Sequence, residues 1–332
     1  MLQKILDNIY KIEVPMRDGA LNFLNAYLIL GERNLLIDTG FDRDEAYRTI
    51  TEALDRLGAS MENTDIFLTH MHPDHAELAG RLAVKDTKVY LGTRDAKLLN
   101  ESEKTFSVRM QNPEKKGFPP EVIADYARSF AKRRPFSSAK KCAYTEVFDG
   151  DILEYGGYRL RCIDCAGHSP GQTCLYIDER KLFFCGDHIL FDITPNVSSW
   201  EDNVNPLKDY IKNLEKLKAY EIEIILPAHR GVTCGAHERI DEIIAHHHER
   251  LDELLEVLRK NGPLSTYEIA SRLTWNTPCT WEEMPTFQKY SAVGEVVAHL
   301  AFLLDKGLVE KEIQQGVNLY SVRAVVSPAP CR

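Results

Sequence analysis

The first part of the chain alternates short apolar runs with segments in which apolar residues recur at helical spacing. Two apolar runs between residues 26 and 37, separated by a polar turn, predict a β-hairpin. Helical spacing follows over residues 46–57, and the apolar stretch 66–68 then predicts a buried strand. A helix over 76–84 and a strand over 88–91 come next. Strand, helix and strand in this order predict an α/β layer architecture.

From residue 145 onward, short apolar runs and amphipathic helices return. The expected strands cover residues 158–163, 173–177, 181–185 and 222–226, and the expected helices cover 207–217 and 236–260. Turn residues separate the strands. Asn261-Gly262-Pro263 follows the long helix and predicts a domain boundary, because Gly and Pro interrupt regular structure.

A small C-terminal module follows this boundary. We expect two helices and then two strands, over residues 266–273, 292–304, 307–311 and 319–322. This order resembles a winged helix, in which the second helix reads DNA. Residues 292–300 contain neither Lys nor Arg, and residues 262–326 carry five basic against seven acidic side chains. We therefore expect the module to pack against the rest of the chain or a partner, with no specific DNA binding.

Residues 94–145 differ from their surroundings in charge. They contain twelve Lys and Arg against six Asp and Glu, a local charge of +6, whereas the whole chain sums to −9. An amphipathic helix is expected around residues 122–130, just before Lys132, Arg133 and Arg134. Two interpretations stay open: a solvated helical insertion, or a cationic lid that attracts an anionic substrate. The second makes Lys132, Arg133 and Arg134 candidate substrate contacts.

Length and composition narrow the class of protein. A chain of 332 residues is long enough for one large domain and one small one. The net charge of −9 disfavours general nucleic-acid affinity. We see no signal peptide and no membrane-spanning stretch, and eight cysteines without a signal indicate reduced thiols. We therefore expect a cytoplasmic protein without a membrane partner, and a homodimer stays open.

The strongest chemical signal is the heptapeptide at residues 69–75, Thr-His-Met-His-Pro-Asp-His, which follows the expected strand 66–68. Four metal-binding side chains fall within six positions: His70, His72, Asp74 and His75. Imidazoles and carboxylates are ligands that Zn, Fe, Ni and Mn accept readily. Asp74 could instead cap the helix that follows, with Glu77 completing a capping pattern, and the two roles are compatible.

Three later strand ends carry further candidate ligands. His168 stands in Gly-His-Ser-Pro-Gly, Asp187 ends Cys-Gly-Asp, and His229 ends Leu-Pro-Ala-His. Each of these stretches is a weak signal alone, because it could be an ordinary turn. Their order behind H-x-H-x-D-H makes a metal site the favoured interpretation.

This order of motifs resembles the metallo-β-lactamase-fold hydrolases. The resemblance implies an α/β fold, a four-layer αβ/βα sandwich with a two-metal site at one edge. The ligands that it implies for a first ion are His70, His72 and His168. Those for a second ion are Asp74, His75 and His229. It further implies that Asp187 bridges the two ions and that Asp38 supports the site without binding an ion.

The resemblance also organises the rest of the chain. The long helix and the C-terminal module further resemble the β-lactamase-like protein 2 family, a subgroup with a winged-helix tail. We expect a catalytic domain over residues 1–235, which contains the basic helical insertion 94–145. A linking helix over 236–261 and a winged-helix-like domain over 262–332 are expected to follow. The sequence departs from the family in that insertion and at Ala228 and Arg230, where Pro-Gly-His-Gly is usual.

The implied chemistry is hydrolysis. Two ions roughly 3.5–4 Å apart share a water and lower its pKa from about 15.7 toward 7. We therefore expect a metal-dependent hydrolase that uses metal-bound hydroxide, with Asp74 and Asp187 as its catalytic carboxylates. Zinc is the expected metal, and iron and manganese are alternatives. No Ser or Cys nucleophile is needed, so Ser169 and Cys185 are expected to be structural.

Several substrates and functions stay open. The basic insertion favours an anionic small molecule such as a CoA or glutathione thioester, while RNA or another phosphodiester and a lactone are alternatives. β-Lactam hydrolysis is not expected, because the antibiotic-degrading members use Cys where Asp187 stands. A diiron redox protein of the same fold is a rival, although such relatives usually carry Glu at the position of His72 and a flavodoxin module. The complete ligand set opposes a DNA-binding regulator with a vestigial site.

Three consecutive histidines, residues 246–248, suggest a second metal site. Adjacent residues on a helix diverge by about 100°, so these side chains cannot all bind one ion. His246 and Arg250 resemble the His and the second Arg of a helix motif in the winged-helix subgroup, which makes them candidate substrate contacts. A solvated helix face is the simpler interpretation of this stretch.

Overall fold

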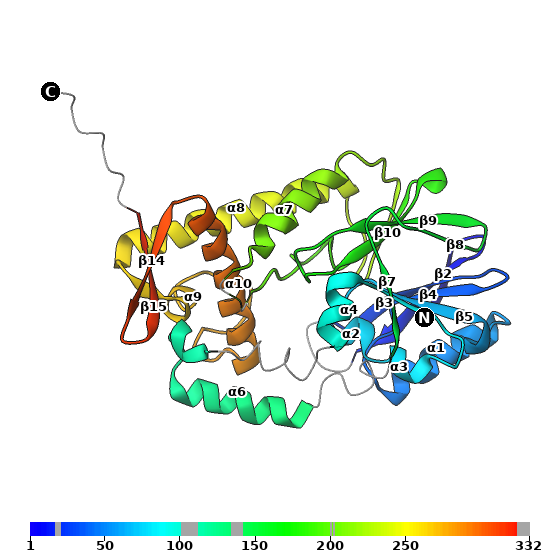
Figure 1. Cartoon of the computed structure of the whole chain (residues 1–332), viewed down its shortest axis with the longest axis horizontal. Helices are drawn as coiled ribbons and strands as arrows, with labels where there is room; N and C mark the ends of the chain where they lie inside the picture. Colours follow the sequence, from blue (N-terminus) through cyan, green and yellow to red (C-terminus); the bar gives the residue numbers. More distant parts are fainter. Residues whose placement is uncertain (17–20, 101–111, 134–141, 200, 202, 324–332) are drawn as a thin grey trace. The chain divides into compact units, whose positions relative to one another are not determined.

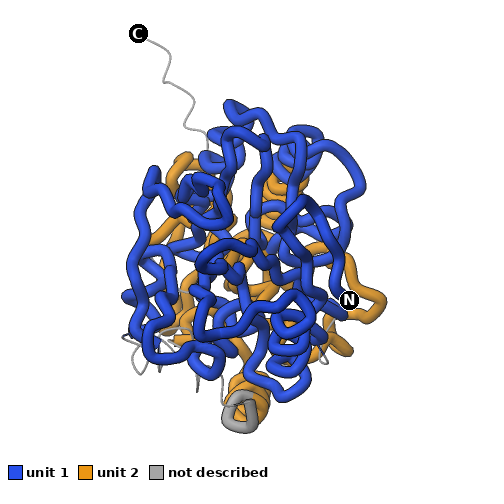
Figure 2. Tube along the Cα trace, turned by 90° about the vertical axis from the view of Figure 1, so that its right-hand side faces the viewer, with its two compact units in different colours: residues 1–106, 134–195, 209–244 blue, residues 107–133, 196–208, 245–332 orange. Residues whose placement is uncertain are grey.

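The computed structural model describes residues 1–332 except 17–20, 101–111, 134–141, 200, 202 and 324–332, and it leaves the side chains of residues 130–133 undescribed. The chain divides into two compact units, which Figure 2 shows in different colours. Unit 1 comprises residues 1–106, 134–195 and 209–244, and unit 2 comprises residues 107–133, 196–208 and 245–332.

Seven strands of unit 1 form a sheet whose strand order follows the chain (Figure 1). They are β1 (Leu2–Leu6), β2 (Ile9–Pro15), β3 (Phe23–Ile29), β4 (Asn34–Ile37), β5 (Thr64–Leu68), β6 (Val89–Gly92) and β7 (Tyr144–Val147). The first four strands pair antiparallel, and β4 to β7 pair parallel. Parallel strands end at the same edge of a sheet, so the residues after β4, β5 and β6 lie at one edge.

Five further strands of unit 1 form a second sheet in the order β12-β11-β10-β9-β8. They are β8 (Ile152–Tyr155), β9 (Tyr158–Asp164), β10 (Thr173–Ile177), β11 (Leu182–Gly186) and β12 (Ile224–Pro227). β10 pairs antiparallel with β9 and β11, and β12 pairs parallel with β11. β9, β11 and β12 therefore run in one direction, and their carboxyl ends share an edge.

The two sheets bury a common core. Tyr27 and Phe67 from the first sheet pack in one buried cluster with Leu160 and Phe184 from the second. The alternate residues of the first sheet face the other way, where Leu36, Ile66 and Leu68 pack with Ile50 and Leu54 of α1 (Asp44–Arg56). A helix layer outside a pair of sheets agrees with the α/β sandwich that the sequence predicted, and this fold class is confirmed.

The remaining helices of unit 1 include α2 (Pro73–Ala76) and α3 (Ala79–Leu82), which follow β5 and are four residues long each. The others are α4 (Thr93–Asn100), most of α7 (Pro206–Leu217) and the start of α8 (Ala236–Asn261), with 3-10 turns η1 (Met61–Asn63) and η4 (Asp178–Arg180). The sequence predicted one helix over 76–84, whereas the structure has α2 and α3. The backbone N–H and side-chain hydroxyl of Thr39 both donate to the carbonyl of His75, which a continuous helix would need for its own hydrogen bond.

Unit 2 combines helices with a three-stranded sheet in the order β13-β15-β14. Its elements are η2 (Pro113–Lys116), α6 (Pro120–Arg133), the end of α8, β13 (Leu264–Ser265), α9 (Thr266–Ala270), α10 (Thr286–Asp305), β14 (Val309–Gln314) and β15 (Val317–Val322). The expected strand pair is a hairpin, and Gln315 and Gly316 between its strands both have positive φ, which suits a two-residue turn. Within the described residues, no helix combines the length and apolarity needed to cross a membrane.

Helix α10 contains the residues that the sequence analysis compared with a recognition helix, and it is largely buried. Most residues of α10 between Tyr290 and Leu303 are buried. Tyr126 of α6 stacks on Tyr290 with ring centroids 3.7 Å apart, and Thr286 donates a hydrogen bond to Asp125. Helix α6, which belongs to the basic stretch 94–145, is thus part of the same compact unit as α10. The domain boundaries expected from the sequence stay a prediction.

A buried carboxylate joins the two sheets at the end opposite the strand ends described above. Asp65, at the start of β5, accepts hydrogen bonds from Arg33 Nε at 2.7 Å and Nη2 at 2.6 Å. Tyr155 of the second sheet donates its hydroxyl to Asp65 Oδ2 at 2.6 Å. Burial acts to raise the pKa of Asp65, but Arg33 and Tyr155 outweigh it and lower that pKa below its ordinary value.

We predict that Tyr155→Phe lowers the free energy of unfolding by about 1–2 kcal/mol, because a buried hydrogen bond to a carboxylate is lost. Urea titration of wild type and variant measures this difference. Asp65 contributes stability when ionised, so the difference should narrow as the pH falls below about 4, the ordinary pKa of an unfolded Asp. Tyr158→Phe, on the same hairpin, is the control, because its hydroxyl makes no described hydrogen bond. An equal loss in both variants would contradict the assignment.

Candidate metal centre

The seven residues that the sequence singled out as ligands lie at the carboxyl ends of strands in unit 1. His70, His72, Asp74 and His75 follow β5, with Pro73 opening the short helix α2. His168 lies between β9 and β10, Asp187 follows β11, and His229 follows β12. These strands end at the edges described above, so the fold brings together side chains that are far apart in the sequence.

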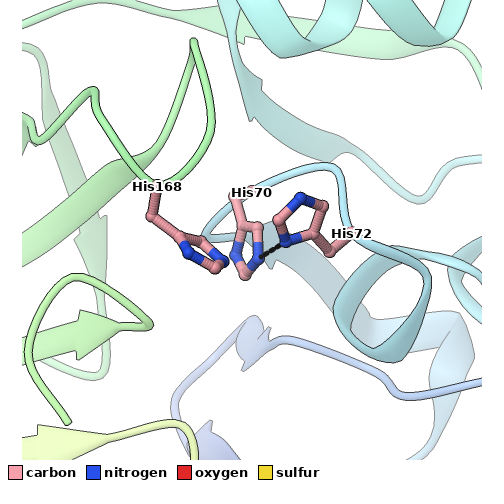
Figure 3. Close-up of side chains that lie close together, drawn as sticks. All are labelled: His70, His72 and His168. Atoms are coloured by element: carbon pink, nitrogen blue, oxygen red, sulfur yellow. Dashed lines mark hydrogen bonds between the residues drawn. The ribbon is translucent and has the colours of Figure 1, made fainter. Parts of the chain in front are cut away.

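His70, His72 and His168 form the first group. His70 Nε2 lies 2.9 Å from His72 Nδ1, and the His168 ring centroid lies 4.9 Å from that of His70 and 4.6 Å from that of His72. Figure 3 shows the three rings converging from two separate loops. One nitrogen from each ring lies within 4.8 Å of the other two, a spacing at which the three could hold one metal ion.

Asp74, His75 and His229 form a second group with the same spacing limit. His229 Nε2 lies 3.3 Å from His75 Nε2 and 3.5 Å from Asp74 Oδ2. His75 and His229 are fully buried, whereas the Asp74 side chain is 20% exposed. Solvent therefore reaches this group at Asp74, whereas its two histidines are shielded from solvent.

Asp187 lies between the two groups. Its Oδ1 is 3.5 Å from Nε2 of both His75 and His229, and its Oδ2 is 3.7 Å from His168 Nε2. Each oxygen of the carboxylate thus faces a different group. This arrangement suits a residue that bridges two ions, the role that the family resemblance implies for it.

The observed separations fit ligands that share a metal ion. Two nitrogen or oxygen ligands that each lie about 2.0–2.1 Å from a tetrahedral zinc ion are about 3.4 Å apart. Separations of 3.3, 3.5 and 3.5 Å connect His229 to His75, Asp74 and Asp187. Asp187 Oδ1 is buried and makes no hydrogen bond to the described residues. The donor set and its spacing therefore fit two divalent ions.

The charges of this centre are unusual for a buried place. Burial acts to raise the pKa of Asp187, but His229 and His75 outweigh it and hold that pKa well below its ordinary value. Asp74 is affected in the same way, and the charge of His75 helps to lower its pKa to about 2. Burial instead lowers the pKa of His70 well below that of an ordinary histidine. At neutral pH Asp74 and Asp187 are therefore ionised and His70 is neutral, as metal ligands need to be. Burial acts to lower the pKa of His75 and His229, but Asp187 and Asp74 outweigh it and raise both, so a bound ion would displace protons there.

Asp38, expected beside the ligands, supports the second group. It follows β4 and is almost fully buried. Its Oδ2 accepts hydrogen bonds from the Thr69 hydroxyl and from His75 Nδ1, each at 2.8 Å, while its Oδ1 accepts from the Thr69 backbone at 2.8 Å. A proton on Nδ1 of His75 leaves Nε2 free to bind an ion.

His229 is positioned by contacts with Phe23 and Asn25 that the sequence analysis did not identify. The Phe23 carbonyl lies 3.1 Å from His229 Nδ1, so Nε2 faces the centre. Asn25 donates its Nδ2 to the carbonyls of Pro227 at 3.1 Å and Arg230 at 2.8 Å, on either side of His229. A polar residue inside the apolar run of β3 was the available signal for Asn25.

The departure from Pro-Gly-His-Gly has a backbone consequence. Arg230 adopts φ of 60°, in the left-handed region that favours Gly and costs another residue roughly 1–2 kcal/mol. Ala228 is buried and donates its N–H to the Gly186 carbonyl at 3.1 Å. Arg230 therefore stands in a backbone conformation that glycine adopts without this cost.

The other residues named in the sequence analysis include two expected structural residues and three candidate substrate contacts. Ser169 and Cys185, expected to be structural, are buried, and burial raises the pKa of the Cys185 thiol well above its ordinary value. The side chains of Lys132 and Arg133 at the end of α6, and all of Arg134, lie outside the described residues. Their proposed role in substrate binding stays a prediction.

The histidine run on α8 differs from the expected solvated face. His248 is exposed, but His247 is buried, with its Nδ1 3.2 Å from His299 Nε2. Arg250 forms an ion pair with Glu253, and its Cζ lies 4.7 Å from the centre of the Trp275 ring. These contacts lie within unit 2 and away from the ligand groups in sequence. A substrate role for His246 and Arg250 stays a prediction.

Comparison with known proteins identifies the family to which this chain belongs. Residues 21–229 match the model of the metallo-β-lactamase superfamily. A β-lactamase-like protein 2 homolog from Caenorhabditis elegans is 24% identical over 86% of this chain and 80% of its own length. An atrochrysone carboxyl ACP thioesterase from Paecilomyces divaricatus is 26% identical over 70% of this chain and 59% of its own length.

A solved structure extends the likeness to nearly the whole chain. The crystal structure of a metallo-β-lactamase family protein from Thermus thermophilus has a TM-score of 0.79 and 26% identity to this chain. The match covers 96% of this chain and 100% of that protein. With a family model that matches more than half of the sequence, the chain belongs to the metallo-β-lactamase superfamily and is a hydrolase of that superfamily.

Proposed function

We propose that the protein is a dinuclear metallohydrolase of anionic thioesters. The observation that carries the proposal is the placement of Asp187 between two groups of ligands, with one oxygen 3.5 Å from His75 and the other 3.7 Å from His168. A group of three ligands alone would suit one ion. Two groups joined by a carboxylate suit a pair.

The proposed ligands of the first ion are His70, His72 and His168, and those of the second are Asp74, His75 and His229, with Asp187 shared. Two divalent ions, when bound, lower the pKa of water and polarise the carbonyl that is attacked. We favour zinc, because imidazole and carboxylate at this spacing suit its coordination, with iron and manganese as alternatives.

The chain's own residues supply the rest of the chemistry. Asp38 holds the tautomer of His75 and the backbone of Thr69, so the second group is organised before a substrate arrives. Asp74 is the more exposed of the two carboxylates, at 20% against 9% for Asp187, and we assign it to the face that water and substrate reach. The proposed reaction forms a C–O bond, breaks the C–S bond and leaves a carboxylic acid and a thiol.

Two observations support a thioester as substrate. One matched relative is named as a thioesterase of an acyl carrier protein, so the superfamily scaffold is used for this bond in a related protein. Residues 94–145 carry a local charge of +6, which raises the local concentration of anions such as CoA or glutathione thioesters. RNA, other phosphodiesters and lactones are the alternative substrates in the test below.

We predict close to two metal ions per wild-type chain. Asp187→Asn should retain at most about one ion and lose more than about 100-fold in kcat, because the carboxylate shared by both groups is removed. Inductively coupled plasma mass spectrometry and steady-state hydrolysis measure the two effects. Asp178→Asn, an exposed change on η4, is the matched control and should keep both ions. Wild-type protein that repeatedly holds no metal would refute the centre.

We also predict a substrate order. With the metal-replete enzyme, kcat/KM for a CoA thioester should exceed that for an uncharged thioester of the same acyl group by about tenfold, because charge steers the encounter. Thiol release measures both rates, and added salt should narrow the gap. Lactones, RNA and a phosphodiester complete the panel. Faster turnover of a phosphodiester than of any thioester would replace the substrate assignment.

Neutralising the basic stretch should act on binding. The triple variant Lys132→Ala, Arg133→Ala, Arg134→Ala is expected to raise KM for the CoA thioester several-fold and to leave KM for the uncharged thioester unchanged. The control replaces three exposed basic residues outside the basic stretch by Ala: Arg48, Arg56 and Lys85. Equal KM values for wild type and the first variant would leave this stretch without a role in substrate attraction.

A further inference from the structure

Asp95 is a buried charge next to the metal centre that the sequence analysis counted only as an acidic residue of the basic stretch. It lies in the first turn of α4, three residues after the end of β6. Its exposed fraction is 0%. An ionised carboxylate at such a place needs several donors, so its partners indicate what it holds.

Those partners come from the two loops that carry the first ligand group. The backbone N–H of Met71 donates to Asp95 Oδ2 at 2.9 Å, and Met71 lies between His70 and His72. The hydroxyl of Ser169, the residue after His168, donates to the same oxygen at 2.7 Å.

A third donor comes from the same loop as Ser169. The N–H of Gly171 donates to Asp95 Oδ1 at 2.6 Å. Hydrogen bonds to an ionised acceptor are shorter and roughly twice as strong as neutral ones. One carboxylate thus connects the loop after β5 in the first sheet with the loop after β9 in the second.

Close backbone packing restricts this connection further. A Cβ added at Gly171 would lie 2.4 Å from the Asp95 nitrogen, and one added at Gly92 would lie 2.0 Å from the Gly171 carbonyl oxygen. No side chain fits at either glycine unless the backbone moves. The loop that carries His168 is therefore held against the start of α4 at a fixed distance.

We propose that Asp95 is a positioning residue that sets the distance between the His70–His72 loop and the His168 loop, and so controls how tightly the first group binds its ion. The inference rests on the proposed dinuclear centre. Asp38 holds His75 of the second group directly, and through Thr69 it also contacts His70 of the first group. The described hydrogen bonds of Asp95 instead reach only the His70–His72 loop and the His168 loop, so a change at Asp95 should affect the first ion and leave the second in place.

Asp95→Asn is the direct test. The amide keeps the size of the carboxylate but must present an N–H to one of the three described donors, which should separate the loops. We expect the first ion to bind about 10–100-fold more weakly, while the second ion keeps its wild-type affinity. Competition with a chromophoric zinc chelator resolves the two ions on purified protein and does not depend on activity. Two ions bound with wild-type affinity would overturn the proposal.

Two further variants separate positioning from stability. Ser169→Ala removes one of the three hydrogen bonds, so it should weaken the first ion about fivefold and decides the question if Asp95→Asn does not fold. Tyr155→Phe disturbs a different buried carboxylate, Asp65, and should leave both ions unaffected. Loss of the second ion in Ser169→Ala to the same extent as the first would overturn the proposal. If wild-type protein binds neither zinc, iron nor manganese, the proposed function fails instead.

Discussion

Buried negative charge is the constraint on which this protein's centre depends. Asp38, Asp95 and Asp187 are all buried, and an ionised carboxylate persists at such depth only among donors or positive charges. Asp38 and Asp95 accept hydrogen bonds from loop N–H and O–H groups. Asp187 instead faces the imidazoles of three histidines. Asp38 and Asp95 hold the loops in place, and the negative charge of Asp187 is available to bind cations.

The topology explains why these charges meet. β4, β5 and β6 run parallel in one sheet, and β9, β11 and β12 run in one direction in the other. Residues that follow these strands collect at the edges where the sheets end. The opposite end is joined by Asp65, Arg33 and Tyr155, a cluster that buries charge with complete partners. At one end of the sandwich the buried carboxylate of Asp65 is paired with Arg33 and Tyr155, whereas at the other end the carboxylate of Asp187 is available to metal ions.

Local sequence patterns predicted much of this arrangement and missed what depends on distant contacts. The H-x-H-x-D-H run and the polar residues after apolar strands indicated the ligand groups, because ligands at strand ends are encoded within a few residues. Asp95 gave no such signal, since its partners Met71 and Gly171 are distant in sequence. The break between α2 and α3 was also missed, because Thr39 supplies the competing donors. His247 was expected to be solvated, whereas it is buried and contacts His299, which is distant in sequence.

The contact between Gly92 and Gly171 limits how this protein can diverge. Where two backbones touch, neither position tolerates any side chain, and a change at one cannot be balanced by a change at the other. The loop that carries His168 is therefore unable to acquire new contacts on that side. Variants of this chain that process other molecules must change elsewhere, in segments such as residues 94–145, while the geometry around the first three histidines stays as it is.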